Sequence, residues 1–64
     1  LATAIEQLPE SQRIAVILRF LAHHSLERIA EIMNVTKGAV AGLLRRGVST
    51  LRDLLPSELA ERSS

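Results

Sequence analysis

The stretch SLERIAEIMNVTKGAV (residues 25–40) decides the fold that we expect of this chain. Its apolar residues recur at spacings of three and four, which is the period of a helix. Ser25 is a good N-cap for a helix over Leu26–Met33, and Asn34 tolerates the left-handed conformation in which many helices end. A tight turn and a second helix should follow. This pattern predicts a helix-turn-helix, although helical hairpins with other roles can look similar.

The second helix of the pair should begin after Thr36, a further N-cap residue, and end at Pro56. Val35 would then be an apolar plug in the turn. The face of this helix that packs on the core should carry the apolar stripe Val40, Leu44, Val48, Leu51 and Leu55, with Leu43, Gly47 and Leu54 at its margins.

Three glycines, Gly38, Gly42 and Gly47, interrupt this second helix. Each should cost about 1 kcal/mol relative to alanine in a helix interior. We interpret them as a sign that one face of the helix lies very close to another macromolecule.

The residues before this stretch predict two more helices, at about residues 1–8 and 9–22, with Pro9 at the first position of the second. Apolar residues hardly ever alternate, so no strand is predicted. The expected fold is all-α: a small four-helix domain with a C-terminal helix-turn-helix, of the winged-helix-like DNA-binding class without a wing. Residues 1–55 would form this domain, and residues 56–64 a frayed or disordered tail.

Composition narrows the functional classes. The chain has 64 residues and no cysteine, so it has neither disulfides nor a thiolate metal site, which fits a reducing cytosol. Phe20 is the only aromatic residue, which argues against a stacking platform for single-stranded nucleic acid. No signal peptide is evident, and the longest apolar run is far shorter than a membrane span. We expect a soluble, cytoplasmic domain that is not bound to a membrane.

The net charge is only +1, but it is unevenly distributed. Residues 1–35 hold three arginines and four glutamates, whereas residues 36–55 hold Lys37, Arg45, Arg46 and Arg52 against Asp53 alone. The basic character therefore lies on the glycine-containing helix, as in many nucleic-acid-binding domains.

Four segments, in this order and spacing, resemble the promoter-reading region 4 of bacterial sigma factors, most closely the extracytoplasmic-function type. They are LPESQR (residues 8–13), LRFL (18–21), SLERIAEIMNVT (25–36) and GAVAGLLRRGVSTLR (38–52). Response-regulator helix-turn-helix domains share part of this pattern, and the LPESQR opening favours the sigma factor.

The resemblance implies a non-enzymatic module without a cofactor. It would bind the double-stranded −35 promoter element in the major groove, and it would dock on the flap of core RNA polymerase. In many relatives an anti-sigma factor covers the same domain. By position, the DNA-facing residues would be Thr36, Lys37, Ala39, Ala41, Gly42, Arg45 and Arg46.

The chain departs from the family at Ala39, Ala41, Gly42 and Leu43, where relatives often carry Thr, Lys, Ser and Arg, and at Val48, where a further Arg is common. These departures weaken any transfer of base specificity. Small residues let a helix settle deep in a major groove, where Ala39 or Ala41 could touch a thymine methyl. The same small face could instead seat a helix of a partner protein.

The helix at residues 9–22 is apolar on more than one face, which a single-stripe surface helix does not need. It is either central to the bundle or an apolar docking surface for polymerase, another sigma domain or an anti-sigma factor. Phe20 would belong to such a surface, and the acidic Glu27 and Glu31 could face a basic partner. His23 and His24 are interpreted as helix-end residues, because no further metal ligand or catalytic partner accompanies them.

Overall fold

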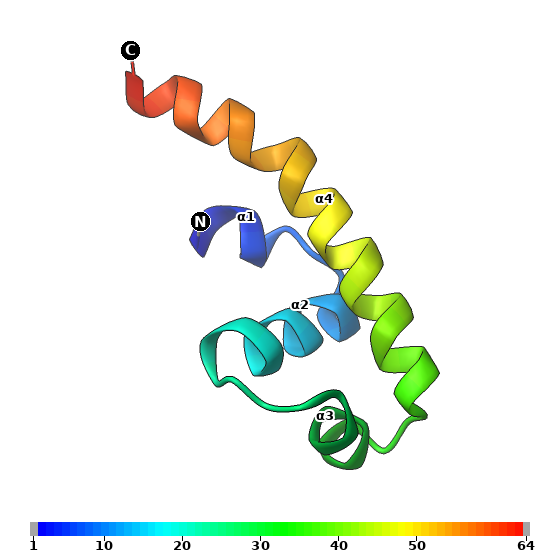
Figure 1. The fold of residues 1–64 in the computed structure, drawn as a ribbon. Helices are drawn as coiled ribbons and strands as arrows, with labels where there is room; N and C mark the ends of the chain where they lie inside the picture. The colour runs from blue at the N-terminus through cyan, green and yellow to red at the C-terminus, as the bar shows by residue number, and fades with distance from the viewer. Residues whose placement is uncertain (1, 64) are drawn as a thin grey trace.

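The computed structural model describes the backbone of residues 2–63 and the side chains of residues 3–54. Within this part of the chain the elements are α1 (Ala2–Glu6), α2 (Glu10–Val16), the π-helical turn η1 (Ile17–Leu21), α3 (Leu26–Met33) and α4 (Lys37–Ser63), with no strand (Figure 1). The all-α fold with four α-helices and a helix-turn-helix made by α3 and α4 is confirmed. The long α4 packs against α1, α2 and α3, so it is the element that all three other α-helices share as a neighbour.

The N-terminal helices begin and end slightly away from their predicted bounds. Helix α1 ends at Glu6, and Leu8 lies beyond it as a buried core residue. Pro9 takes the N-cap position of α2, with φ −54° and ψ 148°, and Glu10 is the acidic residue in the first turn. Proline cannot donate a hydrogen bond, and a cap position does not require it to. The prediction for Leu1 lies outside the described residues.

The second predicted helix changes type before it ends. After Val16 the chain forms the wider η1, in which the N–H of Ala22 donates to the carbonyl of Ile17 at 3.0 Å. His23 follows in the left-handed region with φ 59°, and the guanidinium of Arg19 donates to the carbonyl of His24 at 2.9 Å. The helix end is thus closed by backbone groups and by Arg19, a feature that the periodicity did not predict.

Helix α3 has the caps that the sequence predicted. The Ser25 hydroxyl accepts from the N–H of Arg28 at 3.1 Å, and Asn34 is left-handed with φ 57° and ψ 48°. The N–H groups of Asn34 and Val35 donate back to the carbonyls of Glu31 and Ala30, which is the Schellman arrangement.

The expectation that Val35 plugs the turn is wrong, because its side chain is exposed. The reason is that the turn after α3 is closed by backbone hydrogen bonds and does not require an apolar side chain inside it.

Two groups of buried residues hold α4 in place. At one end, Leu51 of α4 packs with residues of α1 and α2, and Leu44 and Leu54 pack against them. At the other end, Ile29 of α3 and Val40 of α4 are fully buried. The core cluster at the first end is Ala4, Ile5, Leu8, Val16 and Leu51. The predicted stripe is therefore correct for Val40 and Leu51, which are buried, whereas Leu44 and Val48 are half-buried. The prediction for Leu55 lies outside the described side chains.

The expectation that Pro56 ends α4 is wrong, because the helical backbone continues to Ser63. Proline removes one hydrogen bond but leaves helical backbone angles accessible. The residues that follow include Glu, Leu, Ala and Arg, which are good helix formers. Proline is therefore not a stop signal here.

Gly47 lies buried where α4 approaches α2. A Cβ atom at this position would lie 2.8 Å from Cγ2 of Val16, which is too close for two carbon atoms, and 3.7 Å from Cβ of Gln12. The close neighbour of this glycine is the chain's own α2. The interpretation that the glycines serve contact with another macromolecule is therefore wrong for Gly47.

Candidate nucleic-acid interface

The candidate interface is the first half of α4, which Thr36 positions. The hydroxyl of Thr36 accepts from the N–H of Ala39 at 3.0 Å, and its carbonyl accepts from the N–H of Val40 at 3.1 Å. This cap fixes the direction in which α4 leaves the turn, while the burial of Val40 fixes its rotation. Thr36 therefore has a structural task, besides any contact with a ligand.

Small residues line the outer side of this half-helix. Ala39 is exposed, and Ala41 and Gly42 are half-buried. A Cβ built at Gly42 would meet nothing within 4 Å, and one at Gly38 would only reach the Thr36 hydroxyl at 4.0 Å. In contrast to Gly47, these two glycines are not required by packing among the described residues.

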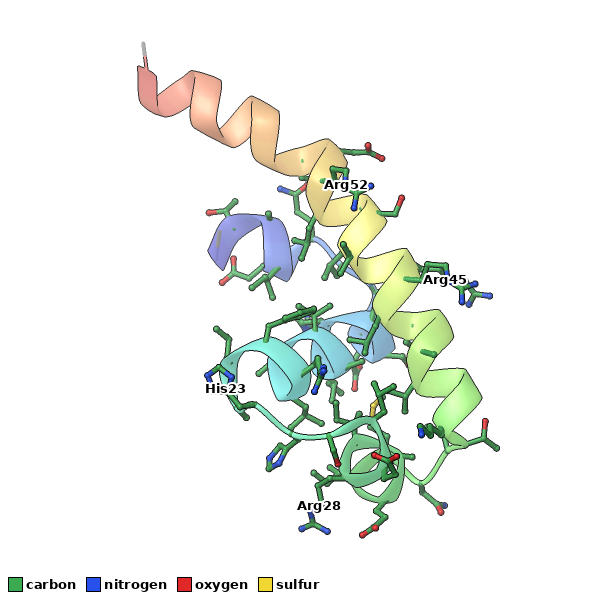
Figure 2. All side chains as sticks on the ribbon, viewed as in Figure 1. His23, Arg28, Arg45 and Arg52 are labelled. Carbon is green, nitrogen blue, oxygen red and sulfur yellow. The ribbon has the colours of Figure 1, made fainter. Side chains whose placement is uncertain are left out.

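Two basic residues of α4, Arg45 and Arg46, lie on the same outer side. Arg45 and Arg46 are both exposed, and Figure 2 shows Arg45 pointing away from α1, α2 and α3. Among the described side chains neither makes an ion pair. One face of α4 carries Gly38, Gly42 and Arg45, which follow one another at spacings of four and three residues. On this face the backbone has little side-chain cover at the two glycines, and the guanidinium of Arg45 lies next to them along the helix.

Lys37, the third basic residue of the predicted set, is paired. Its ammonium lies 2.7 Å from Oε1 of Glu27, which stands in the first turn of α3. The hydrogen bond and positive charge of Lys37 hold the pKa of Glu27 below its ordinary value, and backbone and Ser25 hydrogen bonds act in the same direction. The structure thus joins a predicted DNA contact to a predicted docking residue.

Comparison with known families supports a nucleic-acid function for this arrangement. A sequence model of the family described as Sigma-70, region 4 matches residues 1–51, which is most of the chain. The chain belongs to the sigma-70 region 4 family. This family consists of DNA-binding domains of sigma factors, which function in transcription with RNA polymerase, and it is not an enzyme family; the extracytoplasmic-function type is consistent with the match. No curated protein and no solved structure matches the chain.

The region 4 domain has a second exposed surface, on α2 and η1. We call it the apolar surface; it consists of Ile14, Ile17, Phe20 and Leu21. Phe20 and Leu21 are 51% and 59% exposed, and with Ile14 and Ile17 they form a group of exposed apolar residues within one segment. The other face of the same segment holds the buried Ala15 and Val16. The segment is therefore central to the bundle through one face and exposes apolar side chains on the other.

The acidic docking candidates are both engaged within the domain. Glu27 pairs with Lys37, and Oε2 of Glu31 lies 3.2 Å from Nη1 of Arg28 on the same helix. These contacts compete with any docking of α3 on a basic partner. The pairing of Glu27 with Lys37 was missed at the sequence level, although opposite charges in the first turns of two consecutive helices were a usable signal.

His23 lies away from the candidate interface. His23 is exposed at the turn after η1, on the side of the domain opposite α4 (Figure 2). His24 is half-buried. No helix among the described residues has both the length and the apolar character to cross a membrane.

Proposed function

We propose that this sigma region 4 domain recognises −35 promoter DNA by placing the first half of α4 in the major groove. The observation that supports this most is that this half of α4 has one packed face and one exposed face. Val40 is fully buried against the rest of the domain, while Arg45 and Arg46 extend from the opposite side. A helix held in this way can enter a groove without losing its own core contacts.

The basic residues and the small residues would have different tasks. Arg45, Arg46 and Lys37 would contact phosphates, which position the helix and supply most of the affinity without reading sequence. Ala39 and Ala41 would lie against the base edges, where a methyl group can contact the thymine methyl. Gly38 and Gly42 add no side chain that would hold the backbone away. Thr36 would act mainly through the cap that orients the helix.

A domain with these residues should read sequence weakly. Bidentate contacts from long polar side chains give most of the discrimination among base pairs, and Ala39, Ala41 and Gly42 cannot make them. We therefore expect the preference for a −35 element to rest on thymine methyl contacts and on DNA shape.

Alanine variants of Arg45 and Arg46 test the DNA interface. Each should weaken binding to a short duplex, and each lost phosphate contact should reduce the slope of log affinity against log salt by about 0.9. Fluorescence anisotropy at several salt concentrations measures both quantities. Arg52→Ala, exposed on the same helix beyond the packed Gly47, is the matched control and should change the slope less. Equal affinity and slope in wild type, Arg45→Ala and Arg46→Ala would contradict the proposal.

We also propose that the apolar surface docks the domain on core RNA polymerase or on an anti-sigma factor in the cytoplasm. The exposure of Phe20 and Leu21, next to well-buried residues of the same segment, favours this second role. The polymerase flap is the contact that the resemblance to sigma factors implies. The two surfaces lie on different elements, α2 with η1 and α4, so DNA and protein could bind together.

The docking role predicts that Phe20→Ser abolishes capture of purified core polymerase while leaving DNA binding intact. Ile32→Ser is the matched control, because Ile32 is a large apolar residue that is also exposed, at 45%, but lies on α3. Circular dichroism would verify that both variants fold. If Phe20→Ser and Ile32→Ser bind polymerase as wild type does, the apolar surface has no docking role there.

A further inference from the structure

We propose that Glu27 is an internal competitor of DNA for Lys37, so that the ion pair between α3 and α4 must open before Lys37 can contact a phosphate. This inference rests on the proposed DNA-binding function of α4. It assigns to Glu27 the task of weakening binding to DNA of any sequence, which leaves a larger share of the affinity to contacts that depend on sequence.

The geometry of the pair supports this task. The ammonium of Lys37 and Oε1 of Glu27 are 2.7 Å apart, which is a short, charge-assisted hydrogen bond. While it holds, the positive charge of Lys37 is largely cancelled for a phosphate that approaches α4. Glu27 also places a negative charge beside the path of the DNA backbone, which repels it. Of the three cations proposed to bind phosphate, Lys37 alone is held by a carboxylate among the described side chains.

The pair is also easy to open. Both side chains are more than half exposed, at 59% for Lys37 and 63% for Glu27, so water and salt screen their attraction. A DNA phosphate offers the same kind of anionic acceptor, reinforced by the charges of its neighbours along the strand. Lys37 can therefore exchange Glu27 for a phosphate without any change in the buried core.

The position of Lys37 explains why the free domain keeps the pair closed. Lys37 is the first residue of α4, where the helix end carries partial positive charge and a cation is unfavourable. The first turn of α4 contains no acidic residue that would compensate. Glu27 supplies this missing negative charge from α3.

The test compares DNA binding by wild type, Glu27→Gln, Lys37→Gln and the double variant, with a promoter duplex and a scrambled duplex. Glu27→Gln should tighten binding to both by about twofold to fivefold at low salt, in line with the strength of exposed ion pairs. Its salt slope should change by less than about 0.9, because Lys37 neutralises one phosphate in both proteins once the pair has opened. In the Lys37→Gln background the same substitution should have a much smaller effect.

Glu31→Gln is the matched control for charge. It removes the same charge from the same helix, but Glu31 pairs with Arg28 and not with α4. Its effect on DNA binding should be smaller than that of Glu27→Gln and should be the same in the presence or absence of Lys37. Circular dichroism would verify that all variants fold.

A second measurement needs no substitution. Carboxyl-carbon NMR of Glu27 should show that its pKa rises when the promoter duplex is added, because Lys37 leaves it and phosphates approach. An unchanged pKa in the bound domain would overturn the inference.

The inference and the proposed function fail in different ways. If Arg45→Ala and Arg46→Ala weaken binding but Glu27→Gln has no effect, or has the same effect with and without Lys37, the inference is wrong and the DNA interface stands. If none of these variants changes DNA binding, the proposed function itself is wrong.

Discussion

Gly42 and Gly47 lie five residues apart on one helix and have opposite surroundings. A side chain at Gly42 would enter open space, whereas one at Gly47 would collide with Val16 of α2. The same residue type therefore has two uses in α4. At Gly47 the missing side chain allows the domain to pack on itself, and at Gly42 it leaves the backbone open to a ligand.

Substitution of Gly47 should have the largest effect on stability. Gly47→Leu would insert a branched side chain against Val16, which is buried and stiff, and should lower the free energy of unfolding by about 1–3 kcal/mol or more. In a domain of this size, each kcal/mol corresponds to about 4–8 °C in Tm. Thermal unfolding followed by circular dichroism measures the change.

A double variant sharpens this prediction. Gly47→Ala should also lower Tm. The same substitution should lower Tm by less in a Val16→Ala background than in the wild type, because Val16→Ala removes the atom that the new methyl group meets. Strictly additive effects of the two substitutions would show that Gly47 and Val16 are not in the contact described.

Substitution of Gly42 should act in the opposite direction. Gly42→Ala meets no neighbour and gains helix propensity, so it should raise the free energy of unfolding by up to about 1 kcal/mol. Gly42→Leu should also fold, yet it should weaken DNA binding by keeping the helix out of the groove. Thermal unfolding and duplex titration of the two variants separate stability from binding. A stable Gly42→Leu variant with wild-type affinity would contradict the close approach of this face to DNA.

The smallest expected effect concerns the pH dependence of the ion pair between Glu27 of α3 and Lys37 of α4. The pKa of Glu27 is lower in the folded domain than its ordinary value of 4.5, so the carboxylate stabilises the fold above that pH. This contribution should disappear as pH falls through the lowered pKa. The Tm difference between wild type and Glu27→Gln should therefore shrink on acidification below pH 4.5. A difference that stays constant between neutral pH and strong acid would show that the Lys37 pair does not stabilise the fold.

The bounds of α3 and the N-cap of α4 were predictable because their signals are local. Ser25, Asn34 and Thr36 act on backbone groups within a few residues of themselves, so their side chains indicate the conformation directly. The buried stripe of α4 was predictable at Val40 and Leu51 for a similar reason, since helical periodicity places them on one face.

The features that were missed depend on residues far apart in the chain, or on a choice between two backbone conformations that the local sequence allows. Nothing near Gly47 reveals that Val16 lies against it, so its role could not be told from that of Gly42. The π-helical turn η1 occupies a stretch whose apolar spacing suits an α-helix as well, and the hydrogen bond of Arg19 to the carbonyl of His24 is not visible in that spacing. Pro56 is unfavourable in a helix without being incompatible with one. Whether α4 ends there therefore depends on how strongly the residues that follow favour a helix.

The central claim is that the first half of α4 reads promoter DNA, and an NMR titration tests it most directly. The labelled domain would be titrated with a short duplex that carries a −35 element and with a scrambled duplex, each at two salt concentrations. We predict amide shifts that cluster on residues 36–46, differ between the two duplexes and weaken with salt. Shifts that are absent from this segment in a folded domain, or that fall on η1 instead, would contradict the claim.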